Sequence, residues 1–114
     1  MLQKIARLLV VSLLLIPLVS HAQEESFALQ GWVTDNAKVL TIEQNQALTQ
    51  NIAAYEQNTS NEIAVLILQT LNDVPIENIA VETFNTNGIG KKGKDNGVLL
   101  VVALDDKKAR IEVG

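Results

Sequence analysis

The sequence contains no cysteine, and its single histidine, His21, lies near the start of the chain. The lack of cysteine excludes disulfide bonds, a cysteine nucleophile and thiolate zinc sites. Beyond residue 22 the lack of histidine also excludes a Ser-His-Asp triad and imidazole ligands for zinc. Any bound metal must therefore be held by oxygen atoms, which suits calcium and, less well, magnesium. No zinc is expected.

Residues 1–22 have the layout of a secretory signal peptide. Lys4 and Arg7 give a positive start, and residues 8–16 form an apolar run that only one serine interrupts. Pro17 then breaks the helix pattern. This apolar run is too short for a membrane span, which needs about 20 residues.

Small residues precede a cleavage site that we predict between Ala22 and Gln23. The remainder of the chain would then act outside the cytoplasm, in the periplasm or the extracellular space. The alternative is an uncleaved N-terminal segment that anchors the protein to the membrane.

Positive charge is scarce once this leader is set aside. Two of the nine basic residues lie in it, so the rest of the chain has seven basic against thirteen acidic residues and a net charge of −6. An acidic domain repels nucleic acid and anionic lipid, so the sequence predicts no nucleic-acid partner.

Hydrophobic periodicity predicts an α/β protein, a three-layer α/β/α sandwich with a mixed sheet and the order α-β-α-β-β. Thr41 and Gln44 form a predicted capping box at the start of the first helix. Trp32 and Phe84 are expected in the core. Arg110 is expected on a solvent face or in a structural salt bridge. The predicted segments are a flexible lead-in (23–30), an irregular opening segment (31–40), helices from Thr41 to about residue 58 and from Pro75 to Gly88, buried strands at 62–70 and 97–104, a turn at 105–108 and an antiparallel strand at 109–113.

The connection before the second buried strand matches the pattern Gly-x-Gly-x-x-Gly over residues 88–93. The interpretation as a dinucleotide-binding motif is rejected, because that motif needs a strand before it and a helix after it, whereas here the predicted helix comes first and the strand second. Two alternatives stay open: the loop binds a phosphate, a lipid headgroup or a metal, or it is a solvated loop ending in an Asp-Asn-Gly turn. The candidate residues are Lys91, Lys92, Lys94, Asp95, Asn96 and Gly97.

Residues 88–100, GIGKKGKDNGVLL, resemble the signature of the TPM domain family. Residues 33–40, VTDNAKVL, and 110–114, RIEVG, resemble it as well, in the same order. The resemblance implies an α/β/α sandwich. It also connects the chain with thylakoid lumen proteins described as acid phosphatases and linked to photosystem II repair. Other members are exported bacterial proteins, often with a membrane segment further on. Some members are associated with calcium binding.

The resemblance covers residues 31–114 and only the first part of the family pattern, which continues into a Tyr-Gly-x-Glu stretch and further helices. The chain is therefore expected to be a fragment, and the sequence leaves open whether a downstream membrane anchor belongs to the full protein. Because the last strand should return toward Asp95, the absent glutamate is expected near that residue. Asp95 is the first metal-ligand candidate and Asp35 the second. An Asx turn or a cap is the alternative role for Asp35.

Three functions are compatible with these observations. The chain is predicted to be an exported, calcium-binding accessory module in the maintenance of envelope or membrane proteins, which would be its partners. By family resemblance alone, a metal-assisted phosphatase is the second hypothesis; its catalytic residues are unknown. The third is a fragment with no activity of its own, whose open strand edge at residues 109–114 favours pairing with another chain.

Overall fold

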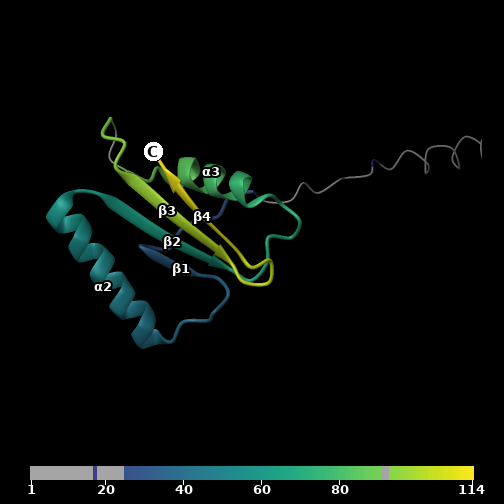
Figure 1. Cartoon of the computed structure of the whole chain (residues 1–114), viewed down its shortest axis with the longest axis horizontal. Coiled ribbons are helices and arrows are strands. Elements are labelled where there is room, and N and C mark those ends of the chain that lie inside the picture. Colours follow the sequence, from purple (N-terminus) through teal and green to yellow (C-terminus); the bar gives the residue numbers. More distant parts are fainter. Residues whose placement is uncertain (1–16, 18–24, 91–92) are drawn as a thin grey trace, which may run out of the picture.

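Figure 1 shows a computed structural model of the chain, which describes residues 17, 25–90 and 93–114. The predicted signal peptide at residues 1–22 lies outside the described residues except for Pro17. The α/β class and the mixed sheet are confirmed, and a further strand precedes the predicted elements. The elements are β1 (Val33–Asp35), α2 (Ile42–Thr59), β2 (Glu62–Leu68), α3 (Ile76–Asn87), β3 (Gly97–Ala103) and β4 (Lys108–Val113).

The four strands form one sheet in the order β1-β2-β3-β4. The first three run parallel, and β4 runs antiparallel to β3 as predicted. Glu62 lies opposite Gly97, so β2 and β3 begin at the same end of the sheet. The apolar run of β2 is buried from Ala64 to Leu68, which fits a strand covered on both faces.

The prediction of an irregular segment at residues 31–40 is wrong for Val33–Asp35, which form β1. Val33 and Thr34 pair with Val65 and Leu66 of β2, and both are buried. Three residues are too few to show a periodic pattern. The pairing with β2, which is remote in sequence, therefore decides the conformation of this segment.

Two helices cover opposite faces of the sheet (Figure 1). Ile79 and Ala80 of α3 pack in the larger apolar cluster, on the face that carries Leu66 and Leu99. Ile52 of α2 packs on the other face with Val65 and Ile67. The predicted sandwich is confirmed, although α2 lies over β1 and β2 only.

β3 was expected to be buried on both faces, but its burial alternates along the strand. Leu99 and Val101 are completely buried beneath α3. Leu100 and Val102 point to the α2 face and are half-buried, because α2 does not reach over this strand.

Local signals fix the ends of both helices. The Oγ1 of Thr41 accepts a hydrogen bond from the Gln44 N–H at 3.1 Å, and the Gln44 Oε1 accepts from the Thr41 N–H at 2.9 Å. This confirms the capping box. Pro75 precedes α3, and Gly88 ends it in the left-handed conformation at φ 60°. Within the part of the chain that the structure describes, no helix has the length and apolarity needed to cross a membrane.

Candidate functional site

The glycine-rich loop between α3 and β3 folds back so that its two ends touch. A β-carbon on Gly97 would lie 2.8 Å from the Gly90 nitrogen, and one on Gly90 would lie 2.9 Å from the Gly97 nitrogen. Neither approach is compatible with a side chain, so both positions require glycine. The helix precedes the loop and the strand follows it, which confirms the order predicted from the sequence and is the reverse of the order in a dinucleotide-binding motif.

Asn96 attaches the loop to the start of β2. Its Nδ2 donates to the Ser60 carbonyl at 2.6 Å, and its own carbonyl accepts from the Glu62 N–H at 2.9 Å. The next residue, Gly97, exchanges two backbone hydrogen bonds with Gly114, at 3.0 and 3.2 Å. The end of β4 therefore returns beside this loop, as the antiparallel prediction required.

Asp95 stands exposed beside this anchor, in the left-handed conformation at φ 46°. Lys94 is exposed as well, whereas Lys91 and Lys92 lie outside the described residues. An open hollow of about 270 Å³ lies next to Asp95. Its lining comes from α2, β2, β3, β4 and the connections before β2 and β3: Tyr55, Asn61, Ile63, Asp95, Asn96, Gly97, Val98 and Val113.

Asp35, the second metal-ligand candidate, lies at the opposite end of the sheet. It pairs with Ile67 near the end of β2, whereas Asp95 precedes the start of β3. Its carboxylate accepts hydrogen bonds from the Leu40 N–H at 2.8 Å and the Val39 N–H at 3.3 Å. The carboxylate thus holds the loop between β1 and α2. This role is structural, as the alternative expected, but it is not the helix cap, which is Thr41.

The structure thus does not bring the two predicted ligands together. Over residues 25–90 and 93–114 it contains no group of three or more histidine, cysteine, aspartate or glutamate side chains placed to hold a metal ion. Asp95 is left as the one predicted ligand with an accessible carboxylate.

Two further carboxylates have structural partners. Asp105 accepts from the Gln69 Nε2 at 2.6 Å, and Asp106 accepts from the Leu71 N–H at 3.0 Å. They tie the β3–β4 turn to the loop that follows β2. Arg110 forms the expected salt bridge, with Glu112 at 3.1 Å.

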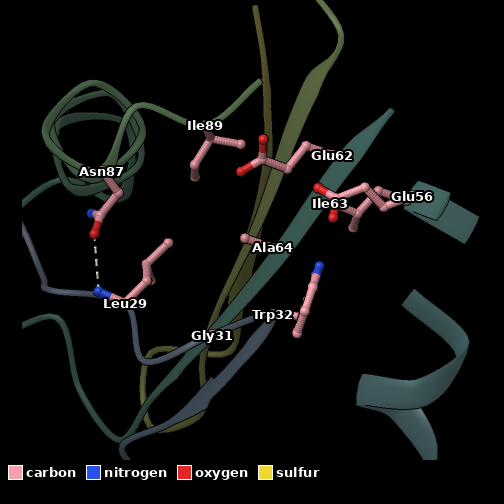
Figure 2. Close-up of a pocket in the computed structure, with 9 residues that line it drawn as sticks. All are labelled: Leu29, Gly31, Trp32, Glu56, Glu62, Ile63, Ala64, Asn87 and Ile89. Carbon is pink, nitrogen blue, oxygen red and sulfur yellow. Dashed lines mark hydrogen bonds between the residues drawn. The ribbon is translucent and has the colours of Figure 1, made fainter. Parts of the chain in front are cut away.

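A second pocket, which the sequence did not predict, shares Ile63 with the hollow next to Asp95 (Figure 2). It has a volume of about 370 Å³. Figure 2 shows the side chains of Glu62 and Ile89 turned toward the same hollow. Leu29, Gly31, Trp32, Glu56, Glu62, Ile63, Ala64, Asn87 and Ile89 line it.

Trp32 is part of this pocket and not of the core, so its predicted burial is wrong. Its exposed fraction is 37%, whereas Phe84 packs against the larger core cluster as expected. Trp32 precedes a strand of three residues, where no periodicity indicates which way a side chain points. Nothing in the sequence pattern marked it as a pocket residue.

The lead-in forms one wall of the second pocket. Its described part, residues 25–30, has no regular structure, yet hydrogen bonds attach it to α3. The Leu29 N–H donates to the Asn87 Oδ1 at 3.0 Å (Figure 2), and the Asn87 Nδ2 donates to the Phe27 carbonyl at 2.7 Å. The start of the domain is therefore fixed beside the same end of the sheet as Asp95.

These features define an α/β sandwich with a mixed four-stranded sheet and two open pockets where β2 and β3 begin. Residues 33–114 match the TPM domain family, and the chain belongs to that family. It is similar to the N-terminal domain of a protein from P. gingivalis, solved by solution NMR, with a TM-score of 0.67 and 31% sequence identity. The match covers 73% of this chain and 53% of that one, so this chain spans about half of the solved relative. No curated protein matches the sequence.

Proposed function

We propose that this chain is an exported TPM-domain module that binds calcium weakly at Asp95 and acts as an accessory in the maintenance of envelope or membrane proteins. The observation that carries the calcium proposal is the exposed carboxylate of Asp95 on a loop whose base is held by Asn96, Gly90 and Gly97. A carboxylate next to this held base loses little conformational entropy when it binds an ion.

The neighbouring groups fit a weak oxygen-ligand site. Tyr55, Asn61 and Asn96 line the same hollow as Asp95 and carry neutral oxygen atoms. Calcium takes 6–8 oxygen ligands. Since one carboxylate and neutral oxygens supply only part of that number, water must complete the shell. We expect an affinity in the range of extracellular modules, with a dissociation constant of about 10⁻⁴–10⁻³ M.

A titration with calcium tests the proposal. Trp32 is the only tryptophan, and it lines the pocket that shares Ile63 with the Asp95 hollow. Its fluorescence, together with calorimetry, should report calcium binding to the chain. Asp95→Asn should abolish the signal, because it removes the accessible carboxylate.

Asp73→Asn is the matched control, because Asp73 is also exposed and lies in the loop after β2, at the other end of the sheet. It should leave binding unchanged. Equal titrations of the Asp95→Asn and wild-type chains, or no binding at millimolar calcium, would contradict the proposal.

A metal-assisted phosphatase is the second candidate, favoured by the exposed Lys94 next to Asp95. Since residues 23–114 contain neither histidine nor cysteine, the reaction would need an aspartate or a metal-activated water as the nucleophile. The same two variants distinguish the candidates. Hydrolysis of a phosphomonoester that requires calcium and disappears in Asp95→Asn favours the enzyme. Calcium binding without hydrolysis favours the binding module.

The accessory role and the membrane or envelope partners rest on the family to which the chain belongs. An acidic domain fits protein partners better than nucleic acid or anionic lipid.

A further inference from the structure

β4 forms an edge of the sheet, because β3 lies on one side of it and no described strand lies on the other. Its apolar side chains are unusually open to solvent: the exposed fractions of Ile111 and Val113 are 64% and 66%. An exposed edge strand with apolar side chains is a template for pairing with another chain. We propose that β4 pairs antiparallel with β4 of a second copy of this chain, with Ile111 on the two-fold axis.

The backbone of β4 presents the correct groups at this edge. Gly97 and Gly114 exchange both of their hydrogen bonds, so they form a hydrogen-bonded pair in the antiparallel ladder. Such pairs alternate with non-bonded ones. The backbone groups of Arg110 and Glu112 therefore point to β3, and those of Ala109, Ile111 and Val113 point outward from the sheet.

These outward-pointing backbone groups can bond to the same groups of a second copy when Ile111 lies on the two-fold axis. If Ile111 lies opposite Ile111 of the second copy, then Ala109 of each copy lies opposite Val113 of the other. Each of these pairs joins residues whose backbone groups are free of β3. The arrangement supplies about six hydrogen bonds between the copies.

The charged side chains of β4 favour this register over shifted registers of the same strand pair. With Ile111 on the axis, Arg110 lies opposite Glu112 of the second copy on both sides, on the face that carries their salt bridge. With Arg110 on the axis, two arginines lie opposite each other. With Glu112 on the axis, two glutamates lie opposite each other. With Ala109 on the axis, Arg110 faces Lys108. Like charges directly opposite are destabilising in a sheet, and opposite charges are favourable.

The same register also brings apolar side chains of the two copies together. Ile111 and Val113 lie beside Leu100 and Val98 on the face that α2 leaves open. Pairing places Ile111 against its counterpart and Val113 against Ala109 of the second copy. The apolar strip then continues across the interface and loses exposed surface. This inference does not depend on calcium binding.

Cysteine cross-linking tests the register directly, since the chain has no cysteine of its own. Two Ile111→Cys residues would have Cα atoms about 5.5 Å apart, within the range of about 4.4–6.8 Å that a disulfide spans. Two Val113→Cys residues would be about 14 Å apart along the strands. We expect Ile111→Cys to form disulfide-linked dimers at least about tenfold faster than Val113→Cys.

A mixture of Ala109→Cys and Val113→Cys chains should cross-link readily, while each alone should not. Equal cross-linking at all three positions would indicate unspecific association and overturn the proposal. Absence of cross-linking at Ile111 would overturn it as well.

Light scattering on the uncross-linked chain provides the second test. Ile111→Lys should convert the dimer to a monomer, because it places two charges on the axis. Ile42→Lys is the matched control, since Ile42 is 74% exposed at the start of α2. It should leave the dimer intact. A wild-type chain that stays monomeric at high concentration, or a dimer unaffected by Ile111→Lys, would show that this edge does not bind a second copy.

Discussion

The two faces of the sheet are built differently. On the α3 face, Leu66, Leu99 and Val101 have no exposed surface, and side chains from α3 close over them. On the α2 face, only β1 and β2 are covered, and the apolar side chains of β3 and β4 become more exposed toward the edge. The same alternating strand thus supplies a dry core on one side and an accessible surface on the other.

The helices differ in the same sense. α3 has four buried residues and no side-chain hydrogen bond at its start. α2 is longer, yet it has a single buried residue, Ile52, and a complete capping box. Packing against the sheet therefore contributes most of the stability of α3, whereas α2 depends more on its own sequence signals.

The largest expected effect is in the dry core. Leu99→Ala should lower the free energy of unfolding by about 3 kcal/mol, because it removes a completely buried side chain and leaves a cavity. Leu100→Ala makes the same change one residue later on the half-buried face. It should cost about 1 kcal/mol, which reflects partial burial without a closed cavity. Urea unfolding followed by circular dichroism measures both.

Equal costs for the two leucines would mean that something covers the α2 face of β3 in solution. The same curves address the hypothesis of an inactive fragment. A single cooperative transition with coincident spectroscopic probes would count against an incomplete, unfolded chain.

The sequence identified the elements whose signals are local or long. The run of β2, the Thr41 capping box and the stop at Gly88 each follow from residue types within a few positions. β1 escaped detection because three residues carry no period, and pairing with β2 determines them. The open face of β3 escaped as well, since an apolar run does not show how far a helix reaches across the sheet.

The site was predictable only in part. The loop position and the return of β4 beside Asp95 followed from the order of the elements. The pocket around Trp32 depends on how the lead-in attaches to Asn87, a contact between residues far apart in sequence. A structural role for Asp35 was foreseen as an alternative, although the residue binds the loop after β1 and does not cap a helix; it lies at the far end of the sheet from Asp95.

A smaller effect on the free energy of unfolding should distinguish α2 from α3. Thr41→Ala removes the side-chain cap of α2 and should cost about 1 kcal/mol. Thr86→Ala, on the exposed side of α3, is the matched control. It should be neutral or slightly stabilising, because alanine has the higher helix propensity. The same urea curves measure both variants. A negligible effect of Thr41→Ala would mean that packing, and not the cap, holds α2 in place.

The smallest expected effect on the single chain lies at the edge of the open face. Ile111→Thr should change the free energy of unfolding by no more than about 0.5 kcal/mol at low protein concentration, because Ile111 is 64% exposed. Threonine keeps the branched side chain that favours a strand. At high concentration a wild-type dimer would gain stability by mass action, and Ile111→Thr should reduce that gain. If the thermal midpoint depends on concentration in neither the wild-type nor the Ile111→Thr chain, then β4 does not pair with a second copy and stays an open edge.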